Sequence, residues 1–175
     1  MNIRVYSGER VIDMEQNRER IYSCCFTGHR NISSNKIIPL TIILENEIEK
    51  LISIGVKYFY CGGALGFDTL AAKTILKLKD NYEIQLIIVI PYSAQDKSFT
   101  KEQKEEYKQI LNLSDDKICL SNHYYNGCMQ KRNRYMVDNS NYCICYLIEE
   151  KGGTVYTVTY AKKHNLNIIN TANLL

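Results

Sequence analysis

The stretch Cys61-Gly62-Gly63-Ala64-Leu65-Gly66-Phe67-Asp68-Thr69 joins an apolar run to a periodic helix, and it decides the fold. The apolar run covers Val56 to Tyr60, and after the glycines apolar residues recur at the spacing of one buried helical face. A strand, a glycine turn and a helix start together present free backbone N–H groups to an anion. The pattern favours a phosphate or carboxylate site, although glycine turns also join strands to helices where no ligand binds.

A second glycine turn, Gly152-Gly153-Thr154, follows a buried strand that we expect over Tyr142 to Ile148. The six residues after this turn, 155–160, are mostly β-branched or aromatic, so local propensity favours a strand there. The two cations Lys162 and Lys163 are instead typical of the last turn of a helix. The position of the segment in the alternating pattern of the chain predicts a helix.

Composition limits the class of protein. The chain has 175 residues, of which 45% are hydrophobic and 23% charged, which is ordinary for one globular domain. We expect that domain over residues 21–175, after a charged extension at 1–20. The net charge of +3 gives no argument for nucleic acid, and the longest apolar run is too short to span a membrane. No signal peptide is evident, so we expect a cytoplasmic protein.

Seven cysteines raise the question of disulfides and metals. Four of them, Cys24, Cys25, Cys143 and Cys145, lie in apolar segments, where a reduced cysteine packs as a small hydrophobe. No two cysteines have the C-x-x-C spacing that is typical of structural zinc sites. We therefore expect reduced, structural cysteines, no metal site and no cofactor.

Apolar segments and periodic segments alternate along the chain. Strands are expected at 21–27, 57–61, 83–90, 117–121, 142–148 and 166–170, and helices at 39–53, 67–79, 100–113 and 129–138 as well as after Gly153. Pro39 suits the first turn of its helix. This alternation predicts an α/β, Rossmann-like and mainly parallel sheet with helices on both faces. Ligands of such sheets bind outside the carboxyl ends of the strands.

That edge supplies the candidate site. The predicted ligand-binding residues are Thr27, Gly28, His29, Arg30, Gly62, Gly63, Ala64, Gly66, Asp68, Thr69, Pro91, Tyr92, Gln95, Arg132, Asn133, Gly152, Gly153 and Thr154. Among them, Arg30 offers a planar fork for phosphate, and His29 could accept or donate a proton. For both residues the plain alternative is a solvated loop residue.

Other candidates also carry two interpretations. Asp68 could cap its helix or hold a ribose hydroxyl, and Thr69 and Thr154 could be helix caps or phosphate ligands. The cations of the segment Gln130 to Arg134 could line a phosphate pocket, contact another subunit or form a solvated helix face. Tyr92, together with Tyr124 and Tyr125, could stack on a base, although the chain has 14 tyrosines.

Taken together, the motifs resemble a known family. Thr27 to Arg30, Gly62 to Thr69, Pro91 to Gln95, Gly127 to Asp138 and Gly152 to Thr154 occur in the order found in the YpsA-like branch of the SLOG superfamily. This Rossmann-like group is related to LONELY GUY enzymes and to the DNA-processing protein DprA. The resemblance covers residues 21–172 and implies binding of a nucleotide or nucleotide-derived molecule at the sheet edge.

The resemblance does not decide whether chemistry follows binding. LONELY GUY enzymes carry a PGGxGTxxE motif, and neither glycine turn of this chain is followed by the corresponding glutamate. Cleavage of an N-glycosidic bond commonly needs a carboxylate, for which Asp68, Glu149 and Glu150 are the remaining candidates.

The sequence therefore favours a binder of a nucleotide-derived small molecule, acting as a sensor or a sequestering sponge. The alternative is a hydrolase of the nucleotide N-glycosidase or phosphoribohydrolase type. We also expect a homo-oligomer with no membrane partner. A nucleic-acid partner of the DprA kind is the least favoured class.

Overall fold

The structure is a computed structural model that describes residues 4–5 and 19–175. Most of the predicted extension at 1–20 lies outside the described residues. In chain order the elements are β1 (Arg4–Val5), β2 (Ser23–Gly28), α2 (Ser34–Ser53), β3 (Tyr58–Cys61), α3 (Phe67–Leu78), β4 (Gln85–Ile90), α4 (Lys101–Leu113), β5 (Asp116–Cys119), α5 (Cys128–Asp138), β6 (Tyr142–Tyr146), α6 (Gly153–Lys163), β7 (Asn167–Asn170) and the 3₁₀ turn η1 (Thr171–Asn173).

The strands form one parallel sheet. Within the described residues it has seven strands in the order β1-β5-β4-β3-β2-β6-β7, and every neighbouring pair is parallel. From β2 to β5 the chain adds each strand on one side, and it then returns to place β6 on the other side of β2. This reversal creates a switch point between β2 and β6, where ligands of doubly wound sheets commonly bind.

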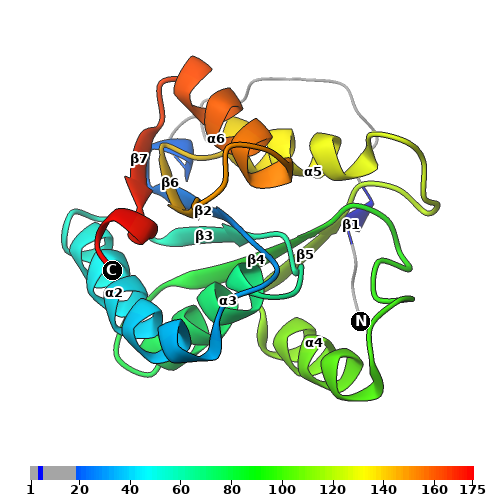
Figure 1. The fold of residues 1–175 in the computed structure, drawn as a ribbon, viewed down its shortest axis with the longest axis horizontal. Helices are drawn as coiled ribbons and strands as arrows, with labels where there is room; N and C mark the ends of the chain where they lie inside the picture. Colours follow the sequence, from blue (N-terminus) through cyan, green and yellow to red (C-terminus); the bar gives the residue numbers. More distant parts are fainter. Residues whose placement is uncertain (1–3, 6–18) are drawn as a thin grey trace.

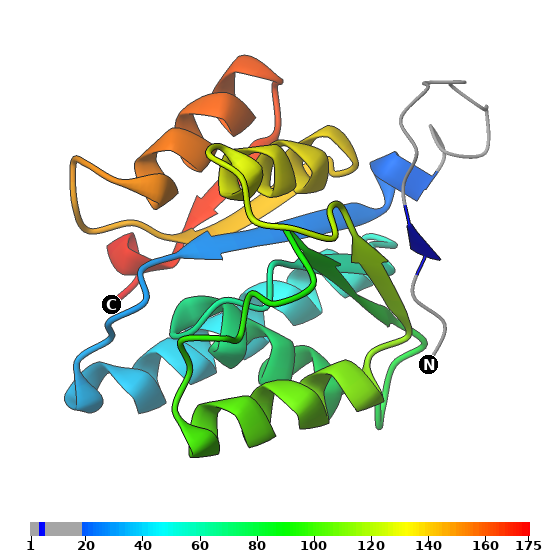
Figure 2. The same cartoon turned by 90° about the vertical axis from the view of Figure 1, so that its right-hand side faces the viewer.

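Helices cover both faces of the sheet (Figure 1), as the alternation predicts. Because successive side chains of a strand point to opposite faces, β2 sends Phe26 into one core and Cys25 into the other. The first core packs α2, α3 and α4 against the sheet, and the second packs α5 and α6. The side view shows the two helical layers with the sheet between them (Figure 2). The α/β, Rossmann-like prediction is confirmed.

The helix expected at 39–53 begins earlier than the sequence indicates. α2 starts at Ser34 after an extended Ser33, so Pro39 lies inside the helix and not in its first turn. Proline lacks the N–H that would bond to the carbonyl one turn earlier, which usually weakens a helix interior. Here residues 33–39 are exposed to water, and water can bind the freed carbonyl. The prediction failed because it treated proline as a start signal.

The segment after Gly152 is helical, as its place in the alternation predicts. α6 buries Val158 and Ala161 in the second core, and its last turn carries Lys162 and Lys163. Burial of one face against the sheet therefore outweighs the strand propensity of the β-branched residues.

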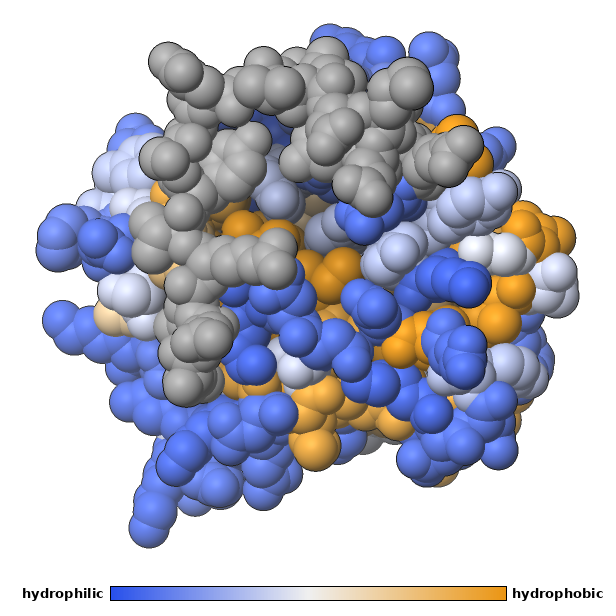
Figure 3. Space-filling model, turned by 180° about the vertical axis from the view of Figure 1, so that it is seen from behind, coloured by the Kyte–Doolittle hydropathy of each residue, from blue (hydrophilic) through white to orange (hydrophobic). Residues whose placement is uncertain are grey.

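The surface and the cysteines add two observations. All seven cysteines, which lie in the described part of the chain, are free and buried. The view from behind Figure 1 shows hydrophobic side chains in patches among hydrophilic ones (Figure 3). Among the described helices, none is both long enough and apolar enough to cross a bilayer.

Candidate functional site

The loops at the carboxyl ends of β2 and β6 meet at the switch point. His29 follows β2, and its Nε2 accepts a hydrogen bond of 3.1 Å from the backbone N–H of Ile148 in the β6–α6 loop. The neighbouring Arg30 is exposed. His29 thus links the two loops that border the switch point, and Arg30 leaves a guanidinium accessible beside them.

The first glycine turn, between β3 and α3, is closed by protein atoms. Gly62 and Gly63 are both buried. A Cβ added to Gly62 would fall on the guanidinium of Arg132, and one added to Gly63 would lie 2.9 Å from Tyr107. Gln95 also packs here: its Nε2 donates to the carbonyl of Gly63 at 3.2 Å and to Tyr107 Oη at 2.8 Å. Protein side chains therefore fill the space beside these two glycines.

A side chain of the protein already occupies one backbone donor of this first turn. The backbone N–H of Ala64 donates to Asp68 Oδ2 at 3.3 Å, and the carboxylate lies 4.0 Å from Nη1 of Arg132. Burial raises the pKa of the Asp68 carboxyl, whereas the Arg132 guanidinium and the Ala64 N–H oppose that rise. Asp68 therefore satisfies one N–H that an open glycine turn would offer to an anion.

Arg132 ties α5 to the first turn. Its Nη1 donates to the carbonyl of Gly62, and its Nε donates to Asn133 Oδ1 at 2.7 Å. The guanidinium is almost fully buried, with 7% of the side chain exposed. Two of its nitrogens, Nη1 and Nε, bond to the protein, so Arg132 holds the turn in place.

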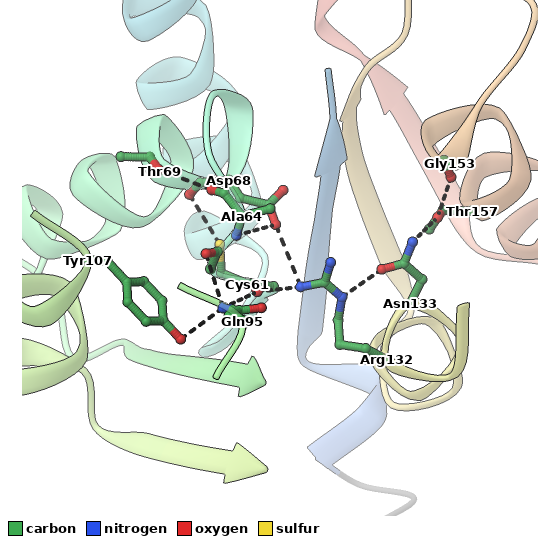
Figure 4. Close-up of polar contacts among 12 residues, drawn as sticks. Cys61, Ala64, Asp68, Thr69, Gln95, Tyr107, Arg132, Asn133, Gly153 and Thr157 are labelled. Carbon is green, nitrogen blue, oxygen red and sulfur yellow. Dashed lines mark hydrogen bonds and ion pairs between the residues drawn. The ribbon is translucent and has the colours of Figure 1, made fainter. Parts of the chain in front are cut away.

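The hydrogen bonds continue from Arg132 to the second glycine turn (Figure 4). Asn133 Nδ2 donates to Thr157 Oγ1 at 2.7 Å, and Thr157 Oγ1 donates to the carbonyl of Gly153 at 2.8 Å. Arg132 and Asn133 lie side by side next to α5 and are bonded to each other, with Arg132 on the side of the first turn and Asn133 on the side of the second (Figure 4). We call the chain Asp68, Arg132, Asn133, Thr157 and Gly153 the polar relay. It connects two turns that are far apart in the sequence.

The second glycine turn is open. Gly152 and Gly153 are exposed, and a Cβ added to either would meet no atom within 4 Å. Gly152 has a φ of 105°, a conformation that side chains rarely adopt, and no side chain caps α6. Among the described residues, the N–H groups of Gly153 and Thr154 have no hydrogen-bond partner. The turn presents free donors and the positive end of an eleven-residue helix to solvent.

The remaining predicted residues lie on the same edge but in different surroundings. Thr27, Pro91 and Thr154 are buried, Gly28 is packed against Phe67, and Tyr92 is partly exposed. Thr69 does not cap its helix, because its hydroxyl donates to the carbonyl of Ala64 at 3.0 Å.

A groove borders part of this edge. Arg30, Gly66 and Thr69 line this groove of about 410 Å³, together with the ion pair of Lys73 and Glu106. The carboxylate candidates Glu149 and Glu150 are exposed just before the open turn. Asp68, the third candidate, is buried and engaged in the polar relay.

Sequence reasoning missed two residues that shape the site. Tyr107 closes the first turn, and Thr157 carries the relay to the second. Tyr107 occupies the buried face of α4, and only that apolar spacing marks it in the sequence. Thr157 lies one helical turn after Gly153, where a threonine hydroxyl commonly bonds to the preceding turn.

Comparison with known proteins gives the family. The YpsA family model, described as the YspA SLOG family, matches residues 24–173. The SPbeta prophage-derived protein YoqJ of Bacillus subtilis strain 168 is 38% identical over 130 residues, which are 66% of this chain and 76% of that protein. A UPF0398 protein of Halalkalibacterium halodurans is 32% identical over 123 residues, covering 68% of this chain and 65% of its own length.

Solved structures show the same fold at low sequence identity. The DNA processing protein A (DprA) of Helicobacter pylori, described for its single-stranded DNA binding mode, has a TM-score of 0.59 and 17% identity. The match covers 89% of this chain and 67% of that one. The DprA of Streptococcus pneumoniae has a TM-score of 0.63 and 17% identity, and the chain covers half of its length. Fold, motifs and family model agree, and the chain belongs to the YspA SLOG family.

Proposed function

We propose that this protein binds a nucleotide or nucleotide-derived molecule, with a phosphate at the turn Gly152-Gly153-Thr154. The observation that carries the proposal is the open turn: its donors are free, and no side chain fills the space around its glycines. Donors at the start of a helix and the helix dipole favour a phosphate at such a place. At the first turn, by contrast, the Asp68 carboxylate already accepts a hydrogen bond from the backbone N–H of Ala64.

The surroundings of the open turn also suit a nucleotide. Arg30 is exposed just after β2, the strand beside β6, and a guanidinium pairs well with phosphate oxygens. Glu149 and Glu150 are exposed just before the turn, where carboxylates can accept hydrogen bonds from ribose hydroxyls. A chain that holds such a molecule without changing it would act as a sensor or a sequestering sponge.

Calorimetry tests the proposal. We expect isothermal titration with nucleoside 5′-mono-, di- and triphosphates to give measurable affinity, and the matching nucleosides to bind at least about tenfold more weakly. Gly153→Val should reduce phosphate-dependent affinity by about tenfold or more, because its side chain fills the approach to the donors. Thr159→Val places the same side chain on the exposed face of α6, away from the turn, and should change nothing. Unchanged affinity in Gly153→Val would overturn the assignment.

Hydrolysis of the ligand is the alternative, and the position of Glu149 and Glu150 beside the open turn is the observation in its favour. A hydrolase would release free base or phosphate during prolonged incubation, and chromatography of the mixture would detect it. Glu149→Gln or Glu150→Gln would then abolish turnover while binding persists. A binder returns the nucleotide intact in all three proteins.

A further inference from the structure

Three tyrosines, two of them exposed and Tyr92 partly exposed, lie on neighbouring loops at the same edge of the sheet. Tyr92 follows β4, and Tyr124 and Tyr125 lie in the loop between β5 and α5. The rings of Tyr92 and Tyr124 meet edge to face, with centroids 5.4 Å apart and planes at 78°. Tyr124 is 66% exposed and Tyr125 is 40% exposed. We call these three residues the tyrosine platform.

Hydrogen bonds within and between the loops hold the backbone that carries the tyrosine platform. Ser93 N donates to the carbonyl of Ser121 at 3.1 Å, and Ser93 Oγ donates to the carbonyl of Asn122 at 2.7 Å. Cys128 N donates to the carbonyl of Tyr125 at 3.1 Å. The two loops are therefore fastened to each other and to α5. Exposed aromatic rings on fastened loops lose little conformational entropy when a flat molecule stacks on them.

The platform lies within reach of the open glycine turn. Three strand spacings separate β4 from β6 in the sheet, which is about 14 Å between strand axes before any side chain reaches inward. α5 connects the two places: it begins next to Tyr125, and Asn133, about 7.5 Å further along its axis, joins the polar relay to Gly153. β5, which precedes Tyr124 and Tyr125, is one strand further from β6, so inward-reaching side chains must shorten the span that a nucleotide along the edge would cover.

We propose that the tyrosine platform stacks the base of a nucleoside 5′-phosphate whose phosphate sits at the open turn. This proposal rests on the proposed function and adds the base subsite to it. Every nucleobase has an aromatic face, so stacking gives affinity with little discrimination between bases. Discrimination between bases therefore depends on hydrogen bonds from polar groups of the same loop. His123 and Asn126 are exposed next to the tyrosines in the sequence.

The test compares probes with and without a base. We use AMP, GMP, CMP and UMP, with ribose 5-phosphate as the base-free probe, in titration calorimetry at one fixed salt concentration. We expect the nucleotides to bind about tenfold more tightly than ribose 5-phosphate. Tyr124→Ala should remove most of that advantage and leave ribose 5-phosphate unchanged, and Tyr124→Phe should retain it. The matched control is Tyr22→Ala, because Tyr22 is 47% exposed but precedes β2 at the opposite edge.

The outcomes separate this proposal from the proposed function. If Gly153→Val weakens all probes and Tyr124→Ala weakens none, the platform is overturned while the phosphate site stands. Equal losses for AMP and ribose 5-phosphate in Tyr124→Ala overturn it as well. If the wild type binds no nucleotide, both proposals fail. Tight binding of an oligothymidylate that depends on Tyr124, without binding of mononucleotides, assigns the platform to single-stranded DNA and overturns the mononucleotide assignment.

Discussion

The two glycine turns have nearly the same sequence pattern and opposite surroundings. Each places a Gly-Gly pair between a buried strand and a helix, at the same edge of the sheet. At the first turn, Gly62 and Gly63 are buried, and side chains of the protein lie against them. At the second, Gly152 and Gly153 face open space.

The structure gives a reason for glycine at the first turn and none at Gly153. At Gly62 the missing side chain admits the guanidinium of Arg132, so the constraint is internal packing. At Gly153 nothing in the protein needs the space, so the constraint must come from outside the folded chain if there is one. A motif alone does not separate these cases. Arg132, the residue that distinguishes the two turns, lies 70 positions from Gly62 in the sequence, so the local motif does not reveal it.

Removing the arginine should have the largest effect on stability. Arg132→Ala leaves the carboxylate of Asp68 buried without its cation, which typically lowers the free energy of unfolding by about 3–5 kcal/mol. Urea unfolding followed by circular dichroism measures this loss. In an Asp68→Asn background the same substitution should cost less, because no buried charge is left unpaired. Equal costs in both backgrounds would mean that Arg132 acts by packing alone.

The second-largest loss of stability is expected from a side chain added at the first glycine turn. Gly62→Ala brings a methyl group onto a guanidinium that is fixed by the Gly62 carbonyl and by Asn133, so the protein must distort. Overpacking of this kind costs about 2–3 kcal/mol in the free energy of unfolding. Combined with Arg132→Ala, the substitution should cost less, because the nearest colliding group is gone and only Asp68 Oδ2, 2.7 Å from the added Cβ, remains in close contact. An additive loss in the double variant would contradict the collision.

Removing a hydrogen bond from the polar relay between the turns should have a smaller effect on the free energy of unfolding. Asn133→Ala removes the donor to Thr157 and should lower the free energy of unfolding by about 1 kcal/mol. Thr157→Val removes the other partner, and a double-mutant cycle should show a coupling of about 0.5 kcal/mol or more. The control is Thr159→Val, on the exposed face of α6. Additive losses at Asn133 and Thr157 would show that the hydrogen bond between them contributes nothing.

Local and periodic features could be predicted from the sequence. The alternation of strands and helices gave the parallel sheet and the position of both turns at its carboxyl edge. It also overrode the strand propensity of the segment after Gly153, which α6 confirms. Such features succeed because each depends on a single segment and on the need to bury one face of it.

Contacts between distant segments could not be predicted. The sequence offers Arg132 as a free cation in a polar helix, and only the fold shows that it is buried against Gly62 and Asp68. The predicted start of α2 was wrong for a different reason. Pro39 is tolerated inside the helix because water can bind the carbonyl that it leaves free, so proline did not mark the first turn. The candidates at the first turn therefore remain proposals for ligand binding, whereas their role in packing is visible.

The smallest effect on stability is expected at the open turn, where it tests the difference between the two turns most directly. Gly153→Ala adds a methyl group that meets no atom within 4 Å, and the backbone of Gly153 lies outside the left-handed region. The free energy of unfolding should change by no more than about 0.5 kcal/mol, and the better helix propensity of alanine favours a slight gain. The same urea titration that shows a large loss for Gly62→Ala is the measurement. A comparable loss for Gly153→Ala would mean that protein atoms close the second turn as well, and the phosphate site would lose its main support. A neutral result together with weaker nucleotide binding would leave ligand approach as the reason for glycine at this position.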